Sequence, residues 1–154
     1  MRAKVIDKAR DLGLDVSVHR LDQGAAAVAD SAAAAVGCAA EQVASCAVLV
    51  ADGEPLVCVT PAGCEPDRDR VADALDVAEV RPASAGETRA ATGFPAGGVP
   101  PFGHGLPVVL DSALLAHETV LATGGDGSTL VEVAPRHLVS CTEATVAAVA
   151  RASA

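Results

Sequence analysis

The chain has 154 residues and a formal net charge of −9, with 11 basic against 20 acidic residues. This length suits one domain spanning residues 1–154, with no second core. So acidic a chain is unsuited to gripping a long stretch of nucleic acid through its phosphates, although a few arginines and backbone N–H groups suffice to hold one end of it. Charged residues follow Met1 where a signal peptide would be apolar, and no apolar run is long enough to cross a membrane, so we expect a cytoplasmic protein.

Hydrophobic residues make up 51% of the chain, but aromatic residues only 1%. The core must therefore consist of Val, Leu and Ala, a composition that favours a sheet covered by short helices. The cysteines are odd in number and form no C-x-x-C pair, so we expect reduced core residues rather than a metal site or a disulfide framework, and no cofactor. They are Cys38, Cys46, Cys58, Cys64 and Cys141.

The first half of the chain shows alternating helix and strand signals. "RAKVIDKARDLG" predicts a short helix that ends at Gly13 and buries Val5, Ile6, Ala9 and Leu12. "DVSVHRL" alternates as a strand, and "AAAAVG" predicts a helix ending at Gly37. The run "QVASCAVLVADGEPLVCVTP" predicts two strands joined at Asp52-Gly53, because glycine accepts the positive φ of a hairpin turn.

The second half continues with short elements. "EPDRDRVADALD" predicts a helix with Val71, Ala74 and Leu75 inward, "AEVRPA" a brief strand, and "SAGETRAAT" a helix with a capping box of Ser84 and Glu87. "PVVLD" is a strand, followed by a helical turn, "SALLAH". "TVLATGG" and "STLVEV" are paired strands, "APRHLVSC" is a helix with Pro135 in its first turn, and the C-terminus is predicted helical. This irregular order indicates a mixed, largely antiparallel α+β domain with short covering helices.

The segment "TGFPAGGVPPFG", residues 92–103, is the strongest candidate for a site. It matches neither a Walker loop nor a dinucleotide fingerprint. Paired glycines permit close approach of backbone to a ligand, and prolines limit the entropy lost on ordering the loop. Such a loop can direct N–H groups at a carbonyl oxygen or a phosphate, but a turn-rich connector explains the same residues.

Other candidate residues each have a structural alternative. Asp111 is able to accept a hydrogen bond from a substrate or to cap the turn that follows it. His104 is a candidate general base or a solvated loop residue. Gly124 and Gly125 offer either a ligand contact or a hairpin turn. No Ser or Cys lies in a nucleophile elbow, and Cys46 and Cys58 are expected to be inert in apolar strands.

The order of "TGFPAGGVPPFG", "VVLD" and "TGG" resembles the YbaK/ProX family, the free-standing relatives of the editing domain of bacterial prolyl-tRNA synthetases. The resemblance extends upstream through "AAAVGCAAEQVASCAVLVADGEPLVCVTPAG" and covers about residues 25–138. It implies a YbaK-like fold and a trans-editing hydrolase that cleaves the ester of a mischarged tRNA, such as Ala- or Cys-tRNA for proline. In the family the glycine-proline loop holds the substrate through its backbone, and the 2′-hydroxyl of the terminal adenosine assists.

Carried onto this chain, the resemblance implies partners and site residues. The partners are the acceptor end of an aminoacyl-tRNA and prolyl-tRNA synthetase, with no membrane. The catalytic set is Gly97, Gly98, Pro101 and Asp111. The substrate-binding set is Ser45, Thr60, Thr92, Gly93, Phe102, Gly103, His104, Gly124 and Gly125.

One departure from the family concerns Ser45, which occupies the position of the usual family lysine in "EQVASCAVLV". Serine supplies one neutral donor where lysine supplies a cation and three donors. Two hypotheses follow: a deacylase of altered specificity, or a catalytically silent module that binds an aminoacyl adenosine or a synthetase. Arg81 and Arg89 are the cations that we consider as replacements for the lysine.

Overall fold

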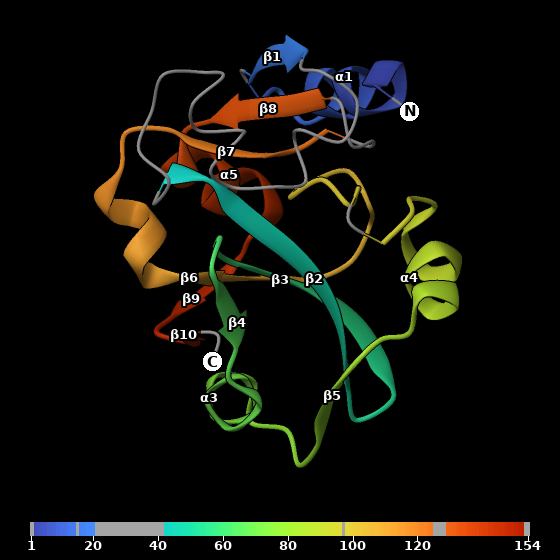
Figure 1. Ribbon diagram of the computed structural model, residues 1–154, viewed down its shortest axis with the longest axis vertical. Coiled ribbons are helices and arrows are strands. Elements are labelled where there is room, and N and C mark those ends of the chain that lie inside the picture. The colour runs from blue at the N-terminus through green and yellow to red at the C-terminus, as the bar shows by residue number, and fades with distance from the viewer. Residues whose placement is uncertain (1, 15, 21–41, 97, 125–128, 153–154) are drawn as a thin grey trace.

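The computed structural model describes residues 2–14, 16–20, 42–96, 98–124 and 129–152 (Figure 1). Its helices are α1 (Arg2–Asp11), α3 (Arg68–Leu75), α4 (Ala85–Thr92), α5 (Pro135–Thr142) and the 3-10 helix η3 (Ser112–Ala116). Its strands are β1 (Val16–Arg20), β2 (Ala44–Ala51), β3 (Glu54–Pro61), β4 (Cys64–Pro66), β5 (Val80–Pro82), β6 (Val108–Asp111), β7 (Val120–Thr123), β8 (Thr129–Val133), β9 (Thr145–Ala147) and β10 (Ala150–Ala152).

A five-stranded sheet in the order β5-β2-β3-β6-β9 organises the described part of the chain. β2 pairs antiparallel with β3 and with β5, whereas β6 runs parallel to both β3 and β9. β1, β8 and β7 form an antiparallel three-stranded sheet, and β10 pairs antiparallel with β4. The predicted α+β class, a mixed and largely antiparallel sheet with short helices, is confirmed.

The two faces of the five-stranded sheet bury different clusters, because successive side chains of a strand point to opposite faces. Val48, Val57 and Leu110 belong to a large cluster that also takes in Phe94 and Phe102. On the opposite face, Leu49, Cys58 and Val109 pack with Val71 of α3. In Figure 1, α3 lies below the sheet and α4 beside it, while α1 and the three-stranded sheet lie at the other end of the molecule.

Several local predictions are confirmed because a side chain or a backbone angle fixes them. Asp52 and Gly53 both have positive φ, 48° and 86°, at the turn between β2 and β3. Ser84 and Glu87 form the capping box of α4. Pro135 is the first residue of α5. Asp111 caps η3 through its carboxylate, which is the second of the two roles that the sequence allowed for it.

Two predictions are wrong. Leu12 is 38% exposed, because α1 ends at Asp11 and Leu14 takes the buried place just beyond it. The C-terminus is not helical but forms β9 and β10. Pairing with β6 and β4 outweighs the helix preference of its alanines, since tertiary contacts override propensity. The predicted helix ending at Gly37 lies outside the described residues.

Candidate functional site

The glycine-proline loop, residues 92–103, contains the only two aromatic residues of the chain, Phe94 and Phe102, one near each end. Both side chains are fully buried in the large core cluster. Inside the loop, the Gly98 N–H donates to the Pro95 carbonyl at 2.9 Å, and the Thr123 hydroxyl donates to the Val99 carbonyl at 2.9 Å. Residues 98–102 are all buried. The described residues of the loop are therefore fixed against the core and against β7.

The loop borders a gap along one edge of β2. β5 pairs with this edge only at Leu49–Ala51, and the Ala83 N–H then donates to the Val48 carbonyl at 3.0 Å. Val43 bridges to Leu121 of β7, while its carbonyl accepts from the Ala62 N–H on the β3 side. β5 and β7 therefore flank the same edge, and the stretch of β2 between them has no strand neighbour among the described residues.

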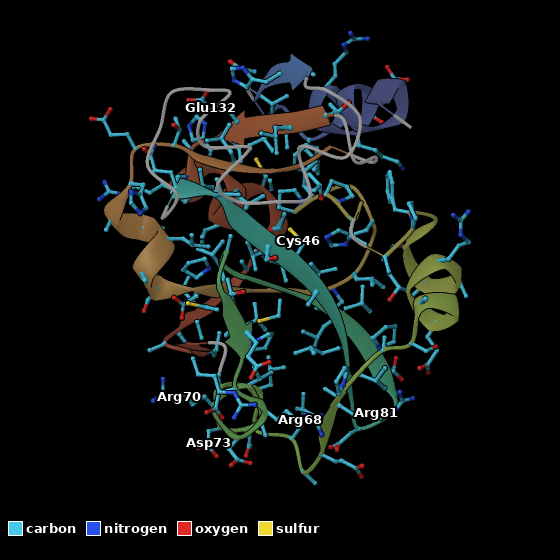
Figure 2. The ribbon with its side chains drawn as sticks, viewed as in Figure 1. Cys46, Arg68, Arg70, Asp73, Arg81 and Glu132 are labelled. Atoms are coloured by element: carbon cyan, nitrogen blue, oxygen red, sulfur yellow. The ribbon has the colours of Figure 1, made fainter. Side chains whose placement is uncertain are left out.

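A pocket of about 360 Å³ occupies this gap, and its lining crosses the edge of β2. On the face that carries Cys46 and Val48, the lining comes from α4, from the segment that leads into α4, and from the glycine-proline loop. On the face that carries Ala47 and Leu49, it comes from β4, β10 and the start of α3. Figure 2 shows Cys46 on β2 and Arg68 at the start of α3. The remaining lining residues are Glu65, Pro66, Arg68, Pro82, Ala83, Thr88, Ala96, Val99 and Arg151.

The two sides of the pocket differ in charge. The loop side presents Thr88, Ala96 and Val99, which are uncharged. The other side presents Arg68, Arg151 and Glu65, and Arg151 is paired with Glu65 at 2.8 Å. An elongated ligand with one charged end therefore has a preferred direction in this pocket.

Four of the expected residues are neighbours of residues that line this pocket, either along the chain or across the sheet. They are Thr92, Gly93, Ser45 and Thr60. Thr92 is buried at the end of α4, where its hydroxyl donates to the Thr88 carbonyl at 2.7 Å, and Gly93 follows it with φ 79°. Ser45 is exposed, and it pairs across the sheet with Thr60, which is buried. Neither Ser45 nor Thr60 lines the pocket itself.

Of the other expected residues, Phe102 lies in the core, and Pro101 is buried between Phe102 and Pro100 in the loop. Gly124 is buried, and its N–H donates to the Thr129 carbonyl at 2.9 Å. An added Cβ at Gly124 would lie 2.9 Å from the Thr129 side chain, so the glycine is needed for packing against β8. Gly97 and Gly125 lie outside the described residues.

Asp111 is buried and its carboxylate is fully engaged with backbone. One oxygen accepts from the N–H groups of Val149 and Ala150 at 2.9 and 3.0 Å, and the other accepts from the Ala113 N–H at 3.3 Å. This carboxylate joins the end of β6 to the start of β10. Its hydrogen bonds favour a structural role over contact with a substrate.

His104 and Gly103 line a second pocket, of about 290 Å³, away from the β2 edge. The Leu106 N–H donates to His104 Nδ1 at 3.1 Å, so the proton of the neutral ring lies on Nε2. This Nε2 is buried and has no hydrogen-bond partner among the residues that the structure describes. Burial lowers the pKa of His104 to about 4, although the nearby Pro101 carbonyl raises it. A base with so low a pKa is a weak proton acceptor at neutral pH.

Burial also determines the state of the two strand cysteines. It raises the pKa of Cys46 to about 12, with a contribution from Cys58, and the pKa of Cys58 to about 12, with a contribution from Asp111. A thiol is nucleophilic only as the thiolate, so neither cysteine is a ready nucleophile. The four described cysteines are free thiols, and Cys38 lies outside the described residues.

The cations at the pocket are not the ones that the sequence suggested. Arg81 is tied to Glu87 by two hydrogen bonds of 2.9 and 2.8 Å, and Arg89 is exposed outside the lining. Arg68 and Arg151 line the pocket instead. No local pattern marks these two arginines, because their position depends on how α3 and β10 pack beside β2.

Within the described ranges, no group of His, Cys, Asp and Glu side chains is arranged to hold a metal ion. The helices found there are also too short or too polar to pass through a bilayer.

Comparison with known proteins assigns this architecture to a family. The family model described as "Aminoacyl-tRNA editing domain" matches residues 23–141, well over half of the chain. No curated protein sequence matches the chain significantly.

Solved structures share the same architecture. The chain is similar to the crystal structure of a candidate trans-editing enzyme for prolyl tRNA synthetase, with a TM-score of 0.89, 29% identity, and 97% of this chain and 96% of that chain covered. It is also similar to the hypothetical protein APE2540, with a TM-score of 0.87, 28% identity, and 96% and 99% covered. The chain belongs to the aminoacyl-tRNA editing domain family.

Proposed function

We propose that the protein is a trans-editing hydrolase, which cleaves the ester between a wrongly attached amino acid and the terminal adenosine of a tRNA. Its substrates are tRNAs for proline that carry a small amino acid, alanine or cysteine. The reaction takes place in the pocket on the β2 edge, and the protein acts in the cytoplasm. Family membership supports the reaction class, and the similarity to a candidate trans-editing enzyme for prolyl tRNA synthetase supports the choice of tRNA.

One observation supports placing the active site in this pocket. The glycine-proline loop, which the sequence singled out, contributes Ala96 and Val99 to a pocket that opens directly onto the unpaired stretch of β2. Both ends of this loop are anchored in the core, and its backbone is tied to β7. A loop held in this way positions a ligand without reorganising, as electrostatic preorganisation requires.

The chemistry requires little from side chains. A water molecule attacks the ester carbonyl carbon, the bond from that carbon to the ribose oxygen breaks, and the ribose oxygen takes a proton. Positioning the water and the ester contributes to the rate without a protein nucleophile. This accords with Cys46, whose thiol lies at the pocket with a pKa raised to about 12 by burial. The substrate's 2′-hydroxyl supplies the further assistance expected from the family.

Ser45 favours a second function, that of a silent binding module. The family lysine would place a cation on β2, and charge-assisted hydrogen bonds are roughly twice as strong as neutral ones. Ser45 is exposed and uncharged, so β2 lacks that cation. A silent module would bind an aminoacyl adenosine or a synthetase and leave the ester intact.

Single-turnover deacylation separates the two functions. The wild-type protein and Ser45→Lys are each mixed with Ala-, Cys- and Ser-tRNA for proline, and release of the amino acid is followed against the spontaneous rate. Hydrolysis by the wild type supports the editing enzyme. If only Ser45→Lys hydrolyses the ester, the wild type is the silent module and the proposed activity is wrong.

A further inference from the structure

Arg68, on the charged side of the pocket, takes no part in cleavage of the ester but is placed to bind another part of the substrate. We infer that Arg68 binds the phosphate of the 3′-terminal nucleotide of the aminoacyl-tRNA, and thereby fixes the direction in which the substrate enters the pocket. This inference rests on the proposed function, because it takes the pocket on the β2 edge as the place where the acceptor end binds.

The position of Arg68 relative to Ser45 follows from the strand geometry. Ala47 lines the pocket, and Leu49 packs in the cluster that contains Val71 of α3. Side chains alternate along a strand, so Ser45 lies on this same face, about 7 Å beyond Ala47. The cation missing at Ser45 and the cation present at Arg68 therefore belong to the same face of the sheet, the one covered by α3.

The charges around Arg68 leave it available for a ligand. Within the described residues, its guanidinium has no hydrogen-bond or ion-pair partner, and the side chain is exposed. Glu65, the acidic residue of the lining, is already paired with Arg151 at 2.8 Å. Asp67 uses its carboxylate to accept from the N–H groups of Asp69 and Arg70 at the start of α3. Arg68 is therefore a free cation at the mouth of the pocket.

The chemistry of the acceptor end matches this arrangement in one direction only. A phosphodiester is an anion that a planar guanidinium binds through two parallel hydrogen bonds. The aminoacyl ester at the other end carries an α-ammonium group, which Arg68 would repel. With the phosphate at Arg68, the ester lies toward Ala96 and Val99, on the uncharged side beside the glycine-proline loop.

Two non-hydrolysable ligands test this role directly. Both are alanyl amides of 3′-amino-3′-deoxyadenosine, one with a 5′-phosphate and one without. Their dissociation constants are measured by calorimetry for the wild type, Arg68→Ala, Arg68→Lys and Arg89→Ala. Arg89 is a matched control, because it is exposed on neighbouring α4 and does not line the pocket.

We expect the wild type to bind the phosphorylated ligand about twofold to fivefold more tightly, as suits one exposed charge pair. Arg68→Ala should remove this preference and leave the affinity for the ligand without phosphate unchanged. Arg68→Lys should keep part of it, and Arg89→Ala should keep it whole. A preference that survives in Arg68→Ala would overturn the inference. So would a wild type that shows no preference or binds neither ligand.

Failure of this inference is distinct from failure of the proposed function, because no bond breaks in the binding measurement. A wild type that prefers the phosphorylated ligand but hydrolyses no tRNA would support the role of Arg68 and contradict the hydrolase. A wild type that hydrolyses mischarged tRNA with no phosphate preference would support the hydrolase and remove Arg68 from it.

Discussion

At the scale of the residue, Gly103 shows how tightly the loop packs against α1. Its φ is 78°, and a Cβ built on it would lie 2.6 Å from the Cβ of Lys8. Gly105, two residues later, has nearly the same φ, 77°, but an added Cβ would have nothing within 4 Å. The two glycines therefore separate the cost of the backbone conformation from the cost of a steric clash.

We expect Gly105→Ala to lower the free energy of unfolding by about 1 kcal/mol, the cost of a left-handed conformation. Gly103→Ala should lower it by about 3 kcal/mol, because overpacking is added to the same backbone cost. Chemical denaturation of both variants measures the difference. Equal losses in the two variants would show that Lys8 moves aside without cost.

His104 gives stability a dependence on pH. Its pKa is about 4 in the folded protein, against 6.5 for the ordinary group. Between these values the unfolded chain binds a proton that the folded protein excludes, so stability decreases as the pH falls from about 6.5 to 4, by up to about 3 kcal/mol. Urea denaturation at several pH values should show this loss in the wild type and a smaller one in His104→Asn. The same pH dependence in both proteins would contradict the assignment.

At the scale of the element, local sequence patterns were enough to predict most of the described helices and turns. The capping box of Ser84 and Glu87 and the Asp52-Gly53 turn are decided within a few residues, so the sequence was sufficient for them. β4 and the two C-terminal strands were missed, because each is defined by a partner far away in the chain. Asp111 is the clearest case, since one side chain serves both a local cap and a contact 38 residues distant.

Asp111→Ala should therefore loosen the C-terminal strands. Removing the carboxylate leaves the N–H groups of Val149, Ala150 and Ala113 without their acceptor, and we expect a loss of about 3 kcal/mol in unfolding free energy. Amide hydrogen exchange at Val149 and Ala150 should quicken first. Asp67→Ala, which removes an exposed cap of α3, should cost about 1 kcal/mol and leave those amides protected. Unchanged stability with lost deacylation would instead make Asp111 a catalytic residue.

At the scale of the whole molecule, the site was only partly predictable. The composition of the glycine-proline loop marked it as a site, because glycine and proline constrain the backbone locally. The pocket could not be predicted, since it arises where β5 and β7 leave part of the β2 edge uncovered. For the same reason Arg68 and Arg151 were missed, whereas Arg81 was named and proved to be paired with Glu87.

The net charge of −9 predicts that the protein holds the acceptor end of a tRNA rather than its body. Each phosphate neutralised by a cation contributes about 0.9 to the slope of log affinity against log salt for a duplex, and about 0.7 for a single strand. We expect a slope of about 2 or less in magnitude, set by the few cations at the pocket. Titration of the tRNA at several salt concentrations measures it, and a slope several times steeper would contradict recognition of the acceptor end alone.

The most direct test of the central claim is to fill the pocket. Ala96 lines it from the glycine-proline loop and is exposed, so Ala96→Leu should fold normally while narrowing the space beside the ester. Ala90→Leu adds the same side chain to an exposed position of α4 outside the lining. We predict single-turnover hydrolysis of Ala-tRNA for proline by the wild type and by Ala90→Leu. In Ala96→Leu the rate should be at least tenfold lower, which corresponds to an activation free energy about 1.4 kcal/mol higher. Equal rates in the two variants, or no hydrolysis by the wild type, would contradict editing in this pocket.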